Sequence, residues 1–219
     1  MVVYDWNEEF CRQYADGLRP FSRFDHGMTA SMIAGELEPL PEAPAILDIA
    51  TGPAFLLIQL AKRIPNAALV GQDSAAPMLA IAREEAARAG FSIDTMFCSA
   101  DNLSAADASF DIVVCKQLLH EADNPAGVIS EALRALKPEG KFFLVDFDAD
   151  SPKAIAVAMR VFLRVAAGRM ISGNFWKSYS SGLPGVEVRK MVSEAGFENV
   201  KLKRAGMNYF ISARKRSKG

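Results

Sequence analysis

The chain has 219 residues, of which 50% are apolar and 23% are charged, and its formal net charge is −1. These values are typical of a globular protein with one sizeable core, and they provide no overall field that would attract nucleic acid or an anionic membrane. Cys11, Cys98 and Cys115 are far apart and form no CxxC pattern, so we expect neither a metal site nor a disulfide framework. The N-terminus lacks the apolar run of a signal peptide, and no segment reaches the roughly 20 apolar residues of a membrane span. We therefore expect a cytoplasmic protein without integral membrane contact.

Strands and amphipathic helices alternate along the chain after a helical N-terminal region. Helices are predicted over 5–15 and 27–38, and the proline-rich connector LPEAPA follows at 40–45. The next elements are predicted, in order, as strand 45–50, helix 53–63, strand 67–73, helix 75–89, strands 93–100 and 110–117, helix 125–136 and strand 140–148. This alternation indicates a parallel sheet covered on both faces.

The pattern changes after residue 150. The remaining elements are predicted as a long helix at 152–168, an irregular aromatic loop at 170–185, a helix at 186–195, and strands at 197–205 and 207–215. Gly206 separates the last two strands, which indicates an antiparallel hairpin at the sheet edge. The predicted fold is α/β, with a doubly wound, mostly parallel, seven-stranded sheet. One domain is expected over 1–219, comprising a helical lid (1–40), a cofactor-binding core (44–150), a substrate-side insert (151–185) and a closing helix with two strands (186–215).

The turn after the first strand, in ILDIATGPAFLLIQLA, is where such a sheet binds its ligand. A dinucleotide site requires G-x-G-x-x-G at this place. The third glycine position is occupied by Phe55, and Asp48 would repel a pyrophosphate. The sequence therefore argues against NAD or FAD, and it contains no phosphate-binding P-loop motif.

An acid at the end of the first strand suits a ligand that carries a cationic amine. Ala50, Thr51 and Gly52 form a small-residue turn that allows close backbone approach, and Asp73 lies 21 residues beyond Gly52, where an acid can bind ribose hydroxyls. Further candidates for cofactor contact are Ser74 and Met78 on the next helix and Asp101 and Asn102 after the third strand. An amino acid joined to a nucleoside meets these requirements, and S-adenosylmethionine is such a molecule. Alternatively, Asp73 and Asp101 are only caps of helices or turns.

Five segments carry a resemblance to a known family: ILDIATGPAFLLIQLA, LVGQDSAAPMLAIAREEA, CSADNLSAADASFDIVVCKQLLHEADNP, ALRALKPEGKFFLVDFD and MVSEAGFENVKL. Over about residues 27–215 the chain resembles class I S-adenosylmethionine-dependent methyltransferases. It is similar to the branch that contains ubiquinone/menaquinone C-methyltransferases and small-molecule methyltransferases. The resemblance implies a Rossmann-like fold and methyl transfer to a small-molecule acceptor, with S-adenosylhomocysteine as product. It also implies that the backbone near Cys115 and Lys116 flanks the methionine part of the cofactor.

The chain departs from the family in this first turn. Ala50 and Ala54 stand where the family usually has glycine, in the pattern D-x-G-x-G-x-G. A methyl group at these positions restricts positive φ, so the turn is expected to sit slightly differently. The departure keeps open a second hypothesis, a non-catalytic S-adenosylmethionine- or S-adenosylhomocysteine-binding protein of the same fold.

His120 is the candidate general base, because it follows the fourth strand and an imidazole titrates near neutral pH. The alternative is a histidine that packs or caps the next helix. His26 in the lid is a weaker candidate for substrate contact. The candidate acceptor-contacting residues are Tyr14 and Met28 in the lid and Arg160, Arg164, Phe175, Trp176 and Tyr179 in the insert.

The aromatic residues of the insert have a second interpretation, as the core of a helix. The insert is also a candidate for a homodimer contact. Nucleic-acid methylation is disfavoured, because the sequence has no basic groove and no Asn-Pro-Pro-Tyr-type motif.

Overall fold

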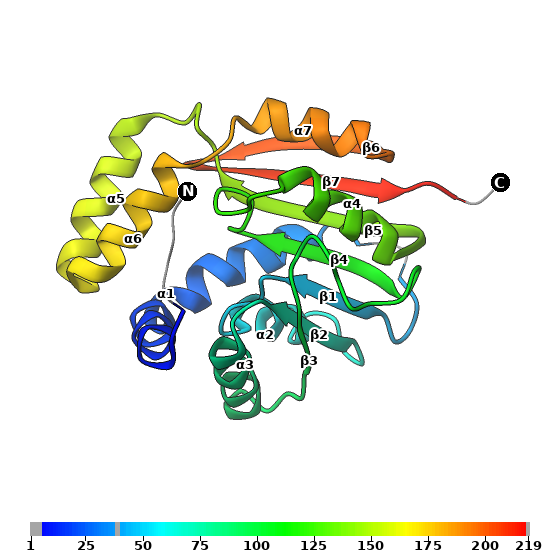
Figure 1. Cartoon of the computed structure of the whole chain (residues 1–219), viewed down its shortest axis with the longest axis horizontal. Coiled ribbons are helices and arrows are strands. Elements are labelled where there is room, and N and C mark those ends of the chain that lie inside the picture. Colours follow the sequence, from blue (N-terminus) through cyan, green and yellow to red (C-terminus); the bar gives the residue numbers. More distant parts are fainter. Residues whose placement is uncertain (1–5, 38–39, 218–219) are drawn as a thin grey trace.

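The computed structural model describes residues 6–37 and 40–217. Within these ranges the chain forms one seven-stranded sheet in the order β3-β2-β1-β4-β5-β7-β6, with helices packed on both faces (Figure 1). The strands are β1 (Ala45–Ile49), β2 (Ala68–Asp73), β3 (Asp94–Phe97), β4 (Phe110–Lys116), β5 (Leu136–Phe147), β6 (Phe197–Ala205) and β7 (Asn208–Lys215). Strands β1 to β5 are parallel, and β7 inserts antiparallel between β5 and β6. The predicted fold class is confirmed.

The helices divide between the two faces of the sheet. They are α1 (Glu8–Ala34), α2 (Phe55–Ala61), α3 (Ala76–Arg88), α4 (Pro125–Ala135), α5 (Lys153–Ala166), α6 (Gly168–Ser180) and α7 (Gly185–Glu194). α1, α2 and α3 share one apolar cluster with the sheet, and α4 and α7 share another on the opposite face. α5 and α6 pack together beyond the end of the sheet (Figure 1).

Two predicted elements differ from the structure. The lid is one continuous helix, α1, that passes through Pro20. The first half of α1 buries Cys11 and Ala15 against α3, and the second half buries Ala30 and Ile33 in the cluster that includes α2. Burial of both halves outweighs the backbone hydrogen bond that proline cannot donate.

The predicted irregular loop at 170–185 is mostly helical. α6 occupies Gly168–Ser180 and buries Ile171, Ser172 and Tyr179. Its glycine, asparagine and serine residues have low helix propensity, so the helix was not evident from the sequence. Packing against α5 stabilises it instead.

Strand alternation decides which side chains face α1. Asp48 pairs in register with Gly71 on β2 and with Val114 on β4. Asp73 and Lys116 lie two residues beyond these partners, so their side chains point to the same face as that of Asp48. Three charged side chains therefore gather on the α1 face of the sheet, at the carboxyl ends of three neighbouring strands.

Candidate functional site

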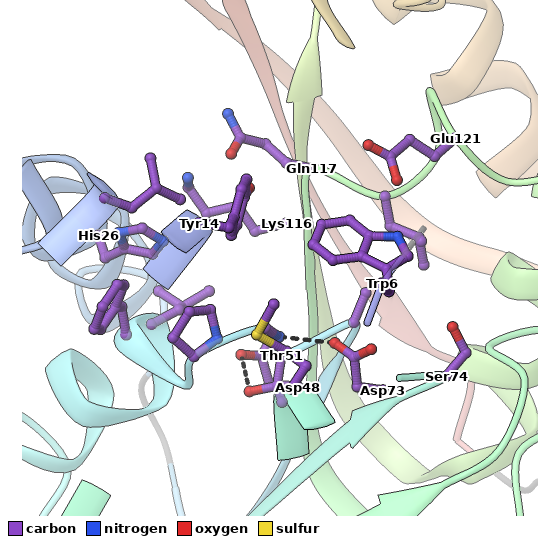
Figure 2. A pocket seen from close by; sticks show the side chains of 18 residues that line it. Trp6, Tyr14, His26, Asp48, Thr51, Asp73, Ser74, Lys116, Gln117 and Glu121 are labelled. Atoms are coloured by element: carbon purple, nitrogen blue, oxygen red, sulfur yellow. Dashed lines mark hydrogen bonds between the residues drawn. The ribbon is translucent and has the colours of Figure 1, made fainter. Parts of the chain in front are cut away.

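A cavity of about 130 Å³ lies where the strand order reverses between β1 and β4, the usual ligand position in an open α/β sheet (Figure 2). Its walls come from the carboxyl ends of β1, β2 and β4 and from α1. The predicted cofactor residues that line it are Asp48, Ala50, Thr51, Gly52, Asp73, Ser74, Met78 and Lys116. The lid contributes Trp6, Tyr14, Leu18 and His26.

Asp48 lies at the floor of the cavity and is 2% exposed. One of its carboxylate oxygens accepts a hydrogen bond from the Thr51 hydroxyl at 3.0 Å. Burial raises the pKa of Asp48 to about 7, although the Thr51 hydrogen bond and the Lys116 charge oppose the increase. Near neutral pH the carboxyl group is therefore divided between its two protonation states, and a cation beside it would favour the charged one.

Asp73 joins the first turn to the start of α3. One carboxylate oxygen accepts from the backbone N–H of Gly52 at 3.0 Å, and the other accepts from that of Ala75 at 2.9 Å. Burial raises the pKa of Asp73, and these backbone hydrogen bonds act in the opposite direction. These hydrogen bonds agree with a turn-capping role for Asp73, and its contact with a cofactor stays a prediction. Each oxygen still has a second lone pair, and the side chain lines the cavity as well.

The turn adopts the backbone conformation of a glycine-rich turn although two alanines occupy it. The φ angles of Ala50, Gly52 and Ala54 are 55°, 54° and 59°. Non-glycine residues adopt this left-handed region at a cost of about 1–2 kcal/mol each. The turn is therefore not displaced as expected. It keeps the glycine-type conformation, and the backbone of Ala50 and Ala54 is strained instead.

Gln72 supports the same turn and was not singled out from the sequence. Its side-chain oxygen accepts from the backbone N–H of Ala50 at 3.1 Å, and its amide nitrogen donates to the Cys98 carbonyl at 2.6 Å. The side chain is buried, so these bonds satisfy an otherwise costly amide. The sequence signal that could have identified Gln72 is a polar amide side chain within an otherwise apolar strand.

An ion pair connects α1 to the end of β4. Lys116 Nζ lies 2.7 Å from Asp25 Oδ2, and the Lys116 side chain is buried. His26 follows Asp25 and contacts the ring of Phe55 edge-on. Burial and the neighbouring Lys116 charge lower the pKa of His26 to about 3, against the opposing effects of Asp25 and the Ser22 carbonyl. The lid therefore presents a neutral imidazole to the cavity.

Three predicted cofactor residues lie away from the cavity lining. Asp101 and Asn102 are exposed in the turn after β3, where Asp101 accepts a hydrogen bond from the Ser99 hydroxyl. Cys115 is buried in the cluster on the opposite face, because alternation along β4 turns its side chain away from Lys116.

His120 is buried behind the cavity rather than in its lining. Its Nδ1 lies 2.7 Å from Asp146 Oδ1, and Glu121 Oε1 is 3.3 Å from Nε2 without the alignment of a hydrogen bond. Burial alone would lower the pKa of His120, but Asp146 and Glu121 outweigh it and raise the pKa to about 9. The imidazole is therefore protonated at neutral pH, which is the wrong state for a general base. The role predicted for His120 has no support from this placement.

The predicted acceptor-contacting residues do not all lie at the cavity. Tyr14 lines the cavity, whereas Met28 is exposed on α1. In the insert, Arg160 lies over the Trp176 ring at 4.8 Å and Arg164 is exposed. The aromatic residues Phe175, Trp176 and Tyr179 pack in a cluster with Phe147 and Ala156. Tyr179 is buried in this cluster, and Phe175 and Trp176 are partly buried against it, which agrees with the helix-core interpretation, while their contact with an acceptor stays a prediction.

The described residues also bear on metals and membranes. Within residues 6–37 and 40–217, no group of three or more His, Cys, Asp or Glu side chains is arranged to hold a metal ion. In the same ranges, no helix has the length and apolar character needed to cross a bilayer.

A doubly wound sheet with an inserted antiparallel β7 and an acidic cavity at the β1/β4 switch point defines the Rossmann-like methyltransferase class of fold. A solved S-adenosylmethionine-dependent methyltransferase from Aquifex aeolicus shares this fold, with a TM-score of 0.70 at 17% identity over 95% of this chain and 98% of that one. Residues 42–179, more than half of the chain, match the methyltransferase domain family, and the chain belongs to that family.

The names of the curated relatives assign them to quinone biosynthesis. The chain is 36% identical over 140 residues to a demethylmenaquinone methyltransferase of Thermus thermophilus, a match that covers 62% of this chain and 64% of that protein. It is 31% identical over 137 residues to the ubiquinone/menaquinone biosynthesis C-methyltransferase UbiE of Desulfotalea psychrophila, covering 61% and 55%. The chain thus spans about three fifths of the length of these relatives.

Proposed function

We propose that this chain transfers the methyl group of S-adenosylmethionine to a small-molecule acceptor. The observation that carries the proposal is that Asp48 and Asp73 line one cavity, beside a turn in which Gly52 has a positive φ. Membership of the methyltransferase domain family supports the same activity.

The residues present fit this cofactor. Asp48 suits the amine of the methionine part, because its pKa is near 7 and a cation beside it would favour the charged carboxylate. The second lone pairs of Asp73 suit the ribose hydroxyls, and Ser74 and Met78 lie beside it in the lining. When bound, the cofactor supplies a methyl group that its sulfonium has already activated. Asp101 and Asn102 stay predictions for cofactor contact.

The lid residues would orient the acceptor and exclude water. Tyr14 and Trp6 lie over the cavity from the α1 side (Figure 2), and positioning of this kind can contribute about 7–11 kcal/mol to barrier lowering. Nδ1 of His26 is buried and makes no well-aligned hydrogen bond within the described residues, although the Ser22 carbonyl and Asp25 lie near the ring. We infer that this neutral ring hydrogen-bonds a polar atom of the ligand. By similarity to the relatives named above, a quinone precursor is the proposed acceptor class.

A second candidate function is cofactor binding without catalysis. Ala50 and Ala54 favour it because they depart from the glycines usual in the family's turn. The raised pKa of His120 favours it because a protonated imidazole does not accept a proton. Carbon or oxygen acceptors that lose a proton would need a base, and His120 would have to release the proton that Asp146 stabilises before it could serve as one.

Calorimetric titration with S-adenosylmethionine and S-adenosylhomocysteine tests the binding half of the proposal. The wild type is expected to bind both, and Asp48→Asn and Asp73→Asn to bind at least about tenfold more weakly, as expected for lost charge-assisted hydrogen bonds. Asp94→Asn removes an exposed acid at the opposite end of the sheet and should leave affinity unchanged. Melting curves of each variant would show that the fold is intact.

Methyl transfer is then assayed with a demethylated quinol acceptor by following S-adenosylhomocysteine release. Release above the acceptor-free rate supports the enzyme. Tight binding with no release from any acceptor pool supports the non-catalytic alternative, and absence of binding to either ligand overturns both.

A further inference from the structure

Charge is unevenly distributed along this nearly neutral chain. Residues 151–186 contain Lys153, Arg160, Arg164, Arg169 and Lys177 and no aspartate or glutamate, although the whole chain has 26 acids against 25 basic residues. Helices α5 and α6 occupy most of this segment. The outer end of the molecule is thus locally cationic, while the remainder carries the excess of acids.

α5 exposes an apolar face that nothing in the described chain covers. Its one buried residue is Ala156, whereas Val165 is 85% exposed. α5 lies on the outer side of α6, at the edge of the molecule (Figure 1). The other large apolar side chains exposed on it are Ile155, Val157, Val161 and Phe162. A monomeric protein rarely leaves such a continuous patch in water without a use for it.

The patch continues onto α1. The ring of Phe21 contacts that of Phe162 edge-on at 5.9 Å, which brings the two helices together. Phe24 and Met28, one and two turns further along α1, are 77% and 51% exposed. We call the set Phe24, Met28, Ile155, Val161, Phe162 and Val165 the α1/α5 surface.

Cations border this surface along one line of α5. Lys153, Arg160 and Arg164 are spaced by seven and four residues, which places them on one side of the helix next to the apolar face. Arg160 lies over Trp176, and among the described residues no acid pairs with Lys153 or Arg164. A helix with one apolar face and basic residues along its margin is the pattern of helices that lie in a membrane interface.

We propose that the α1/α5 surface binds the surface of an anionic phospholipid bilayer. The apolar side chains would enter the interface, and Lys153, Arg160 and Arg164 would contact lipid phosphates. A second copy of the chain is a poorer occupant. A two-fold contact through α5 would place this acid-free cationic segment against itself. The proposal does not depend on the methyl-transfer chemistry.

The position of α1 gives such binding a consequence for the cavity. Tyr14, Leu18 and His26 of the same helix line the cavity. A bilayer held at Phe24 and Met28 would therefore lie next to the lid, and an apolar acceptor could reach the cavity without crossing bulk water.

Vesicle co-sedimentation of the full chain tests the proposal. Binding is expected to vesicles of equal parts phosphatidylcholine and phosphatidylglycerol, with little binding to phosphatidylcholine alone, and is expected to weaken as salt increases. Val161→Ser/Val165→Ser should reduce the bound fraction about tenfold. Val186→Ser replaces a valine of similar exposure on α7 and should not change it.

The charge arm uses a second pair of variants. Lys153→Gln/Arg164→Gln should reduce binding to the anionic vesicles, whereas Lys62→Gln/Lys190→Gln removes the same charge elsewhere and should reduce it much less. The proposal would be overturned if the wild type did not bind anionic vesicles. It would also be overturned if the two double lysine or arginine variants lost binding equally. It would also be overturned if sedimentation velocity showed a dimer that Val161→Ser/Val165→Ser dissociates, because the surface would then be an interface between copies.

Discussion

Lys116 Nζ on β4 lies 2.7 Å from Asp25 Oδ2 on α1, although the two residues are 91 positions apart. The pair ties the lid helix to the sheet beside the cavity, which Lys116 lines. Only 5% of the Lys116 side chain is exposed, so this ammonium depends on Asp25 for compensation.

Removing Asp25 should therefore cost more than removing both partners. We expect Asp25→Asn to lower the free energy of unfolding by about 2 kcal/mol, because a buried ammonium loses its carboxylate, with the 40% exposure of Asp25 limiting the effect. Asp25→Asn/Lys116→Met should recover part of this loss. Urea unfolding measures both, and Glu194→Gln, which breaks an exposed pair, should change stability by less than about 0.5 kcal/mol. A double variant less stable than Asp25→Asn would contradict this account.

Glycine at position 50 should stabilise the protein. Ala50 has a φ of 55°, and glycine adopts this region without the steric cost, so Ala50→Gly is expected to add about 1 kcal/mol to the free energy of unfolding. Ala54→Gly should add less, because it also removes a buried methyl group. The exposed helical control Ala87→Gly should destabilise by about 0.5–1 kcal/mol. A loss of stability in Ala50→Gly would show that the turn is not strained.

Gly71 should be intolerant of a side chain because Thr51 packs directly on it. A Cβ at Gly71 would lie 2.8 Å from Thr51 Cγ2. We expect Gly71→Ala to destabilise by about 1–3 kcal/mol and to weaken cofactor binding, since Thr51 also holds Asp48. Thr51→Ser keeps the hydroxyl and removes the clashing methyl, so Gly71→Ala/Thr51→Ser should be partly rescued. Strictly additive effects in thermal melts would rule out this contact as the cause.

Cofactor affinity should depend on pH through Asp48. Its pKa is raised to about 7, so a cationic amine bound beside it must expel the proton below that pH. Affinity for S-adenosylhomocysteine is expected to increase about tenfold from pH 6 to pH 8. Asp48→Asn should bind weakly and with little pH dependence, and calorimetry in two buffers would detect the released proton. A wild type whose affinity is flat over this range would disprove the role of Asp48.

Stability should decrease at alkaline pH because of His120. Its pKa is about 9 in the folded chain and about 6.5 when unfolded, so the protonated form is favoured by folding. This contribution is fully present below pH 6.5 and is lost as pH rises through 9, with a slope of at most about 1.4 kcal/mol per pH unit. His120→Gln should unfold more easily at pH 6.5 and show a shallower decline. Parallel pH profiles of the two proteins in urea unfolding would refute the assignment.

The sequence predicted most of the sheet because its signals are local. The run AILDIA is apolar except at Asp48, the segment FENVKLKRA alternates Val200 and Leu202 with lysines, and the structure places strands at Ala45–Ile49 and Phe197–Ala205. The break in the helical lid between 15 and 27 and the loop at 170–185 were predicted wrongly, and the structure has helices at Glu8–Ala34 and Gly168–Ser180. Side chains distant in sequence bury those segments, and propensity does not record that burial.

The candidate site was predictable in part for the same reason. Asp48 and Asp73 lie near the carboxyl ends of apolar strands, and parallel strands place these ends at one edge of the sheet, so the convergence of the two acids could be expected. The backbone near Cys115 and Lys116 was predicted to flank the cofactor, and of the two side chains only that of Lys116 lines the cavity, because alternate residues of a strand face opposite sides. The register of β4 with β1 selected Lys116.

The sequence by itself determined the fold class, the first turn and the two acids beside it, because alternation, turn residues and strand order act over short stretches of chain. The tertiary structure decided the charge states and the partners. It placed Asp25 against Lys116, enclosed Asp146 with His120, and left the apolar face of α5 uncovered. These features depend on burial and on contacts between distant segments, which exist only once the chain has packed.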